Sequence, residues 1–370
     1  MKKLGFGLMR LPMKDGNIDT QTVKKMVDEF MSRGFTYFDT AWMYCNGNSE
    51  IAIKECLVDR YPRDSYTLTD KMPSFEIKSL DDRDRVFNKQ LEKTGLTYFD
   101  YYWLHAVSRK NIETFDGNDC WNYINNQKAK GLVKHIGFSY HDDAEFLDEL
   151  LTKHPEIEFV QLQMNYLDWL SPSVQSKACY EVCVKHNKKV IVMEPVKGGA
   201  LAKLPDEAEK MFKDYDTNLS IPSWAIRFVA SLENVYMVLS GMTTLDQMKD
   251  NLSYMEDFKP LNDEENNMCL KAAEIIKENV IIPCTGCEYC LSACPIGMPI
   301  PKLFSLYNID CQDKNPSGWT TQESYYKNLQ IAGPTIDECL DCGACENICP
   351  QHISIRKYLK DVKKHFEGEK

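Results

Sequence analysis

Several absences limit what this sequence encodes. It has no apolar run of about 18 residues, the length that a membrane-spanning helix requires. Its first residues, Met1-Lys2-Lys3 and Gly5-Phe6-Gly7, lack the apolar segment of a secretory signal. It also lacks a clustered basic face, and a net charge of −11 disfavours nucleic acid as a partner. These absences predict a cytoplasmic protein that binds neither membranes nor nucleic acid.

Cysteine, in contrast, is abundant. The chain has 15 cysteines without a signal segment, which indicates a reducing compartment and metal ligation. Eight of them form the run C-x2-C-x2-C-x3-C-P twice, with the copies 55 residues apart. The runs are Cys284, Cys287, Cys290, Cys294-Pro295 and Cys339, Cys342, Cys345, Cys349-Pro350. Such runs are typical of ferredoxins with two 4Fe-4S clusters, in which the fourth cysteine of each run ligates the other cluster.

The crossed arrangement predicts one cluster on Cys284, Cys287, Cys290 and Cys349 and a second on Cys339, Cys342, Cys345 and Cys294. Beyond the prolines, Met298 and Ile300 recur as Ile353 and Ile355, which indicates a duplicated unit. Zinc is the main alternative. Zinc sites usually take two separated cysteine pairs, so a third close cysteine followed by Cys-Pro argues against one.

The other seven cysteines are expected to be mainly buried structural thiols. They are Cys56, Cys120, Cys179, Cys183, Cys269, Cys311 and Cys45, and Cys45 is a candidate exception because it follows Tyr44.

Helical and strand-like segments alternate from residue 19 to about residue 257, which predicts a parallel sheet with crossover helices. The expected strands are 5–8, 36–39, 66–69, 100–104, 135–139, 160–164, 190–193 and 236–239. The expected helices begin near 20 and then span 48–61, 79–95, 113–130, 142–153, 172–187, 222–233 and 244–256. This pattern predicts a closed (β/α)8 TIM barrel.

Three segments are therefore expected: a barrel over residues 1–257, a helical connector over 258–282, and a small α-rich, ferredoxin-like domain over 283–370. Short helices are predicted in the last segment near 301–307 and 325–329.

Polar residues at the carboxyl ends of barrel strands are the candidates for chemistry. Asp39 ends one predicted strand and Tyr44 lies five residues later. Lys71 and His105 follow the next two strands. A phenol is a poor acid near neutral pH, so an adjacent ammonium such as Lys71 would lower the pKa of Tyr44. Each residue alone is more often a solvated, capping or core residue, but together they predict a reactive tetrad.

The sequence here resembles the aldo-keto reductases, over roughly residues 1–257. The resemblance rests on Phe38-Asp39-Thr40-Ala41-x-x-Tyr44, Lys71, Leu104-His105, Gly137-Phe138-Ser139 and Val160-Gln161. It implies that Tyr44 protonates a carbonyl oxygen as hydride arrives from a nicotinamide. It implies in turn that Asp39 holds Lys71 and that His105 hydrogen-bonds the substrate carbonyl.

No G-x-G-x-x-G fingerprint follows a predicted strand, so a Rossmann site is not supported. The resemblance instead implies a nicotinamide dinucleotide site, and the start of a helix at Thr243-Thr244 suits a phosphate. Its residues would be Gly7, Met9, Arg10, Ser139, Gln161, Ser240, Gly241, Met242, Thr244, Gln247 and Asn251. Simple turn and capping roles for Ser240 and Gly241 are the alternative.

Three departures from the family pattern leave the identity and the exact site of the cofactor undecided. Met193 stands where many relatives have an aromatic residue, and Gln247 where a basic residue often binds the 2′-phosphate, so NAD and NADP are both options. Tyr140 follows Ser139 where Asn is common.

The substrate is expected to be an apolar or aromatic carbonyl compound, if the aromatic residues near the strand ends are pocket walls and not core. Those residues are Trp42, Trp103, Trp169 and Tyr140.

Hydride carries two electrons, whereas a 4Fe-4S cluster passes one. Three functions remain in view. One is an NAD(P)H-dependent carbonyl reductase whose clusters exchange electrons with a one-electron carrier protein. Another is a reductase that binds a flavin or is linked to ferredoxin. The last is an electron-transfer or redox-sensing protein with structural clusters.

Overall fold

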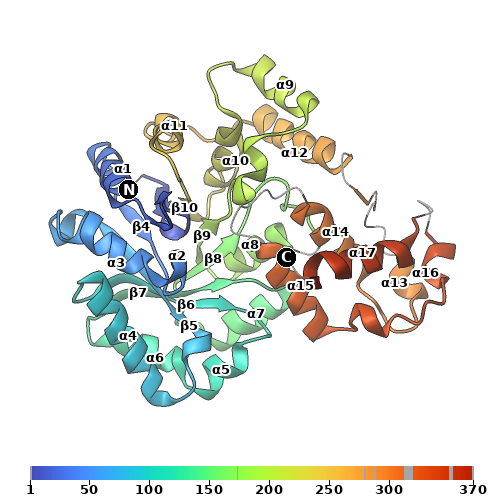
Figure 1. Cartoon of the computed structure of the whole chain (residues 1–370), viewed down its shortest axis with the longest axis horizontal. Coiled ribbons are helices and arrows are strands. Elements are labelled where there is room, and N and C mark those ends of the chain that lie inside the picture. The colour runs from blue at the N-terminus through green and yellow to red at the C-terminus, as the bar shows by residue number, and fades with distance from the viewer. Residues whose placement is uncertain are drawn as a thin grey trace.

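A closed barrel of eight parallel strands forms the larger part of the protein (Figure 1). The computed structural model describes residues 2–172, 174–278, 281–282, 284, 286, 289–311, 320–349 and 353–368. The barrel strands are β1 (Leu4–Gly7), β4 (Tyr37–Asp39), β5 (Thr67–Pro73), β6 (Phe99–Val107), β7 (Val133–Tyr140), β8 (Phe159–Gln163), β9 (Lys189–Met193) and β10 (Val235–Ser240). They follow one another around the barrel in chain order, and β10 pairs with β1. The predicted barrel is confirmed, and each predicted strand has its counterpart.

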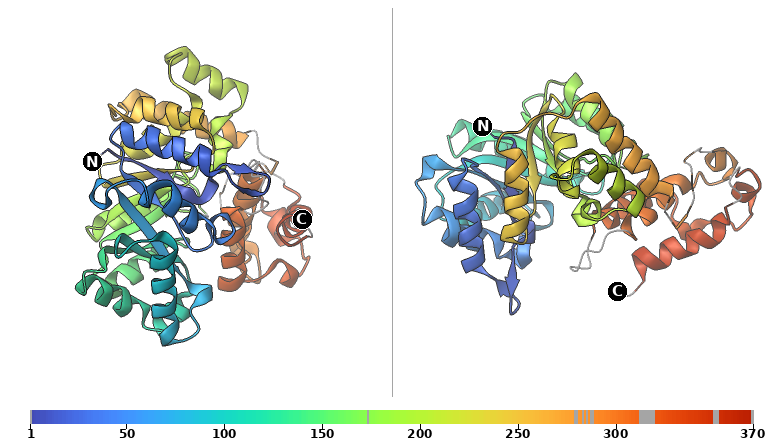
Figure 2. Two further views of the ribbon diagram at one scale, coloured as in Figure 1. Left: turned by 60° about the vertical axis from the view of Figure 1, so that its left-hand side comes forward. Right: turned by 90° about the horizontal axis from the view of Figure 1, so that it is seen from above.

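Helices surround the barrel strands (Figures 1 and 2). They are α1 (Thr20–Ser32), α3 (Ser49–Ile53), α4 (Leu80–Thr94), α5 (Ile112–Gly117), α6 (Cys120–Ala129), α7 (Ala144–Lys153), α8 (Ser176–Lys185), α9 (Asp206–Tyr215), α10 (Ile221–Ala230), α11 (Leu245–Met255) and α12 (Asp263–Glu278). The single helix predicted over 113–130 is two helices, because Asp119 between them adopts a left-handed conformation with φ of 52°.

Helix α9 and a short hairpin in the barrel part were not predicted. The apolar residues of α9 do follow helical spacing, at Ala208, Met211, Phe212 and Tyr215, and the sequence-based prediction overlooked them. The hairpin of β2 (Met13–Lys14) and β3 (Asn17–Ile18) has strands too short to show alternation.

Aromatic side chains fill part of the barrel interior. A buried cluster contains Tyr37, Tyr101, Trp103, Phe159, Ile191, Met237 and Leu239. Gly137 on β7 makes room for the largest of them, because a Cβ there would lie 2.6 Å from the Trp103 ring. The glycine therefore permits close packing where any side chain would collide with the indole.

The smaller domain consists of helices with a core of their own. They are α13 (Tyr289–Ala293), α14 (Ile300–Asp310), α15 (Thr321–Ala332), α16 (Ala344–Asn347) and α17 (Ile355–Glu367). The two predicted short helices are confirmed as the longer α14 and α15. The duplication is visible in the backbone: Ile300 N donates to Met298 O at 2.8 Å, and Ile355 N donates to Ile353 O at 2.8 Å. Helices α14 and α17 begin at these matching positions.

The two parts of the chain meet in the described structure. Helix α12, within the predicted connector, buries Cys269, Ala272 and Ile276 in the barrel core. Val174 of the barrel packs in the core of the smaller domain. The domain boundaries themselves stay a prediction. No described helix has both the length and the apolar character of a membrane span.

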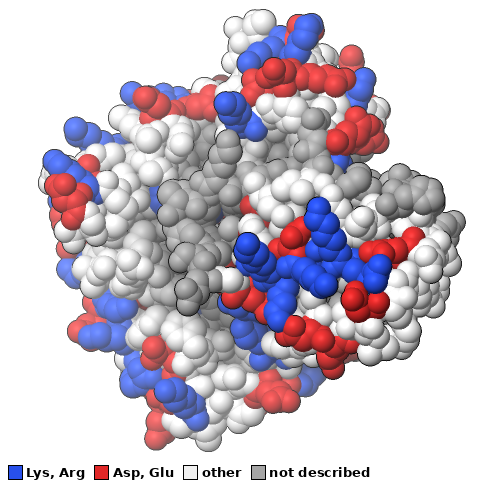
Figure 3. All heavy atoms as spheres, turned by 45° about the vertical axis from the view of Figure 1, so that its right-hand side comes forward, with Lys and Arg blue, Asp and Glu red and all other residues white. Residues whose placement is uncertain are grey.

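A basic stripe on α17 contradicts the sequence-based expectation that no basic face exists. The helix carries five Lys or Arg residues against two acids. In the sequence these charges are interleaved with apolar residues, but the helical repeat gathers them on one side. Figure 3 shows Lys and Arg side chains grouped over the smaller domain, with Asp and Glu around their border.

Candidate functional site

Asp39 and Lys71 form a buried ion pair at the carboxyl end of the barrel. Asp39 ends β4, and Lys71 lies on the neighbouring β5. Lys71 Nζ donates to Asp39 Oδ1 at 2.5 Å and to Thr40 O at 2.8 Å. The second carboxylate oxygen, Asp39 Oδ2, is buried without a hydrogen-bond partner among the described residues. The pair is thus only partly satisfied, and Lys71 is held in a fixed position.

Tyr44 and His105 complete the predicted tetrad. Tyr44 begins the short α2 (Tyr44–Gly47), and Lys71 Nζ lies 4.9 Å from the centre of its ring. The Tyr44 and His105 rings meet edge to face with centroids 5.9 Å apart. All four predicted residues therefore converge on one place.

The backbone around these rings is strained. Cys45, directly after Tyr44, has φ of 51°, and Ala106, directly after His105, has φ of 56°. Left-handed conformations are costly for residues with a Cβ and cluster at functional sites. The Ala106 amide is held by Ser139, whose Oγ accepts from Ala106 N at 2.7 Å. Strained backbone directly after both Tyr44 and His105 supports this place as a candidate functional site.

Burial dominates the electrostatics of the tetrad. It raises the pKa of Tyr44; the charge of Lys71 lowers that pKa, but burial together with Asp39 and Glu194 outweighs it. The shift is therefore opposite to the one expected from the sequence, and Tyr44 keeps its proton at neutral pH. Burial also opposes charge on Lys71, yet Asp39 and Tyr44 raise its pKa overall. Burial first, then Lys71 and His141, holds the pKa of His105 well below its ordinary value, so the ring is neutral.

The predicted dinucleotide residues of β1 and β10 lie side by side. Phe6 on β1 pairs with Ser240 on β10. The two loops also touch, since Thr243 Oγ1 donates to Arg10 O at 3.1 Å. A Cβ on Gly7 would lie 3.5 Å from Ser240 O, and one on Gly241 would lie 3.5 Å from Arg10 Cδ, so the two loops are in contact at these glycines. The members of this group are Gly7, Met9, Arg10, Ser240, Gly241, Met242, Thr244, Gln247 and Asn251.

Two members of that group have internal partners in this structure. Gln247 Oε1 accepts from Thr243 N at 2.8 Å and forms a capping box with Thr244 at the start of α11. Asn251 Nδ2 donates to Ser240 Oγ at 2.9 Å. The amides that would hold a phosphate at this helix end are thus shared with Gln247.

Ser139, Gln161 and Met193 lie at or near the carboxyl ends of three neighbouring strands. Ser139 on β7 pairs with Gln161 on β8, and β8 pairs in turn with β9, which ends at Met193. Gln161 Oε1 is buried with no partner among the described residues. An unpaired buried acceptor is costly and fits a ligand that brings an N–H group. A carboxamide is such a ligand.

Sequence reasoning missed two rings beside the tetrad. His141 follows β7, and its charge would lower the pKa of His105. Tyr325 on α15 of the smaller domain meets the His141 ring with centroids 5.7 Å apart. Asn328 Nδ2 on the same helix donates to His141 O at 2.7 Å. No local pattern could reveal these contacts, because they join segments almost 190 residues apart in the chain.

The four candidate wall residues divide into two pairs. Trp103 and Tyr140 are buried in the core, at 1% exposure each, and are not free to line an open pocket. Trp42 and Trp169 are half-buried against the core, and Lys93 Nζ sits 4.2 Å from the Trp42 ring.

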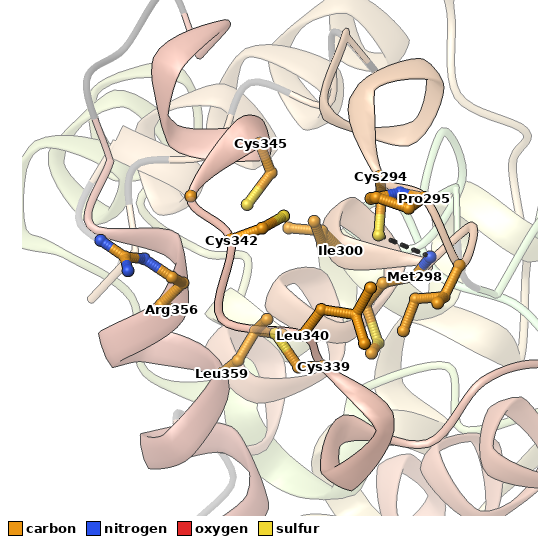
Figure 4. A pocket seen from close by; sticks show the side chains of 12 residues that line it. Cys294, Pro295, Met298, Ile300, Cys339, Leu340, Cys342, Cys345, Arg356 and Leu359 are labelled. Carbon is orange, nitrogen blue, oxygen red and sulfur yellow. Dashed lines mark hydrogen bonds between the residues drawn. The ribbon is translucent and has the colours of Figure 1, made fainter.

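Four cysteines line one cavity in the smaller domain (Figure 4). They are Cys294 from the first run and Cys339, Cys342 and Cys345 from the second. This is one of the two crossed sets that the spacing predicts. Apolar Met298, Ile300, Leu340 and Leu359 form much of the remaining lining. Met298 N donates to Cys294 Sγ at 3.3 Å, a contact that suits a thiolate ligand.

The lining of this cavity suits an iron–sulfur cluster better than a single metal ion. Among the residues described here, no three His, Cys, Asp or Glu side chains group tightly enough for a single metal ion. Four thiols around an apolar space instead match the donor set of a 4Fe-4S cluster. Their role as ligands remains a prediction that this geometry fits.

The second crossed set is only partly described. Cys290 lies on α13 and Cys349 follows α16, and the two are 7% and 9% exposed in one core. Cys284 is half-buried against the same core. Cys287 lies outside the described residues.

The remaining cysteines fit the structural expectation. Cys56, Cys120, Cys179, Cys183 and Cys269 are buried. Cys45 is half-buried, and burial raises its pKa. Its thiol therefore lacks the lowered pKa of a reactive thiolate.

Comparison with known proteins places both parts of the chain. The family model of the aldo/keto reductase family matches residues 3–274, and that of the 4Fe-4S dicluster domain matches residues 283–353. No curated protein gives a significant match.

Solved structures resemble the barrel. The aldo-keto reductase AKR11C1 from Bacillus halodurans (holo form) is 23% identical with a TM-score of 0.59, covering 73% of this chain and 91% of that one. An aldo-keto reductase from Klebsiella pneumoniae in complex with NADPH is 17% identical with a TM-score of 0.58, covering 73% and 90%. The thermostable aldo-keto reductase Tm1743 is 20% identical with a TM-score of 0.58, covering 73% and 94%. These likenesses concern the fold.

Proposed function

Because the chain belongs to the aldo/keto reductase family, we propose that this oxidoreductase reduces an aldehyde or ketone at Asp39, Tyr44, Lys71 and His105. NADPH is the proposed reductant, since the similar Klebsiella pneumoniae protein was solved in complex with it. The observation that carries the proposal is the placement of one buried ammonium, Lys71, between the Asp39 carboxylate and the Tyr44 ring.

Each residue has a distinct task in this proposal. Bound NADPH would supply the hydride. Tyr44 keeps its phenolic proton at neutral pH and gives it to the carbonyl oxygen as negative charge develops there. The nearby Lys71 ammonium stabilises the phenolate that results, and Asp39 holds the ammonium in place. Neutral His105 donates a ring N–H to the same carbonyl oxygen and so fixes its position.

The cofactor would lie across the ends of β1, β7, β8 and β10. Gln161 Oε1 would accept from the carboxamide, and Ser139 Oγ is close by on the paired strand. The loop Ser240–Thr244 and the start of α11 would face the phosphates, with Gln247 moving off the Thr243 amide. Many relatives have a basic residue at the position of Gln247. Among the proposed cofactor residues of this chain the cation is Arg10, whose side chain packs on Gly241.

The smaller domain is proposed to hold two 4Fe-4S clusters, which would supply one-electron storage. The crossed sets are Cys284, Cys287, Cys290, Cys349 and Cys294, Cys339, Cys342, Cys345. These clusters would exchange electrons with a one-electron carrier protein.

The test combines a spectrum with a variant. The protein is purified anaerobically, and its visible absorption near ~400 nm is recorded before and after NADPH is added. A Tyr44→Phe variant should lose carbonyl reduction by about 10²- to 10⁴-fold while its NADPH affinity stays unchanged, because only the proton donor is lost. Undiminished turnover would show that Tyr44 is not the acid. Flavin released on denaturation would support the flavin-containing alternative instead.

A further inference from the structure

A basic groove runs beside the cysteine cavity on the surface of the smaller domain. Its lining includes Lys360, Lys363 and Lys364 of α17. Groove and cavity share three lining residues, Cys339, Arg356 and Leu359. A molecule seated in the groove would therefore be one side-chain layer away from the space between the four cysteines.

The charges of the groove differ in how they are engaged. Arg356 is paired with Glu346 at 2.8 Å, and Lys363 is paired with Asp337. Lys360 and Lys364 of the groove, and Lys357 beside it on α17, are exposed, and none has an acidic partner within ion-pair distance among the described residues. They recur at helical spacing, so three unneutralised ammonium groups follow one side of α17.

An exposed apolar residue lies next to these cations. Leu340, between the cavity cysteines Cys339 and Cys342, is 63% exposed, and Cys342 is exposed as well. A small apolar centre with a charged border is a common form of protein interface. Small, transient redox complexes are held together in this way.

We propose that the groove of α17 docks an acidic one-electron carrier protein of the ferredoxin or flavodoxin class. The partner is acidic in this proposal because the three lysines present positive charge without an acidic partner among the described residues, on a chain whose net charge is −11. Nucleic acid is a poorer fit, because a polyanionic backbone needs an extended basic face, and the acids of the groove already pair with Arg356 and Lys363. The inference rests on the proposed function in one respect: it needs the cysteine cavity to hold a cluster.

The transfer itself is simple to balance. The reduced carrier gives up one electron and becomes oxidised, and this protein gains that electron; no atom or proton changes place. The acceptor of this electron is the proposed cluster of the cavity, which takes one electron at a time.

The test measures binding first. The holoprotein, kept anaerobic, is titrated with a purified acidic ferredoxin by isothermal titration calorimetry at low salt and again at ~0.5 M salt. The variant Lys360→Glu/Lys364→Glu should bind about tenfold more weakly at low salt, and the difference should vanish at high salt. The matched control is Lys25→Glu/Lys130→Glu, two exposed lysines of the barrel, which should bind like the unaltered protein.

The rate of electron transfer from reduced ferredoxin is measured by stopped flow. It should fall in Lys360→Glu/Lys364→Glu and stay unchanged in the control variant. The rate of reduction by reduced methyl viologen should be equal in all three proteins. Equal ferredoxin binding by both double variants, or its absence in the unaltered protein, would overturn the docking surface. Competition by single-stranded DNA that the charge reversal abolishes would assign the groove to nucleic acid and would also overturn it. NADPH-dependent carbonyl reduction is measured in parallel, and its absence with intact ferredoxin binding would reject the proposed function alone.

Discussion

At the scale of single residues, the candidate site is built around one fully buried cation, Lys71. Lys71 is 0% exposed and Asp39 is 2% exposed, and their shared hydrogen bond leaves Asp39 Oδ2 unsatisfied. A buried ion pair adds little stability over an apolar pair, but removal of one partner leaves a buried charge alone. The pair adds little stability for its burial, and its proposed role beside Tyr44 would explain its presence.

This asymmetry can be measured by replacing the partners singly and together. Lys71→Met should lower the free energy of unfolding by about 3–5 kcal/mol, because Asp39 is left as an uncompensated buried carboxylate. Asp39→Asn/Lys71→Met should recover much of that loss, since no charge remains buried. The measurement is urea unfolding followed by tryptophan fluorescence under anaerobic conditions. A double variant as unstable as Lys71→Met would show that the pair does not act through charge.

At the scale of elements, α15 links the smaller domain to the barrel site through His141. Tyr325 packs on the His141 ring, and Asn328 binds its carbonyl. Burial lowers the pKa of His141 to about 4. His141 Nδ1 has no partner among the described residues, so a proton on this ring would find no acceptor there.

Acid should therefore weaken the contact between α15 and the barrel. As the pH falls below about 6.5, the unfolded chain takes up a proton on His141 before the folded protein does, so stability declines toward pH ~4. Between about pH 7 and pH 5.5, protonation of His141 in the unfolded chain should lower the free energy of unfolding by roughly 1 kcal/mol. A His141→Gln variant should lose correspondingly less stability over that interval, as read from anaerobic thermal unfolding. An identical pH dependence in both proteins would contradict the assignment.

The same elements show what a sequence can and cannot reveal. Asp39, Lys71 and His105 could be predicted because each lies at or just after the end of a predicted strand, and parallel strands bring their ends to one edge. The crossed set around the cavity could be predicted because cysteine spacing encodes it. The contact of Tyr325 with His141 could not, because it depends on how two domains pack. The rise in the pKa of Tyr44 was also hidden, because burial belongs to the folded structure.

At the scale of the whole molecule, two cores are built on different principles. The barrel core joins all eight strands and their helices, while the smaller domain packs short helices around its cysteines. Helices of four or five residues such as α13 and α16 are too short to be stable alone. We therefore expect the smaller domain to depend on the proposed clusters far more than the barrel does.

Removal of iron should accordingly unfold one part of the molecule and spare the other. After anaerobic chelation, backbone amides of α13, α14, α16 and α17 should lose protection in hydrogen-exchange mass spectrometry, because the proposed clusters join the two halves of this domain. Strands β1 and β4–β10 should keep theirs, since their core contains none of the eight run cysteines. NADPH binding serves as the control for an intact barrel. Loss of protection throughout the chain would mean that the two cores fold as one cooperative unit, and unchanged protection everywhere would mean that the clusters contribute no stability.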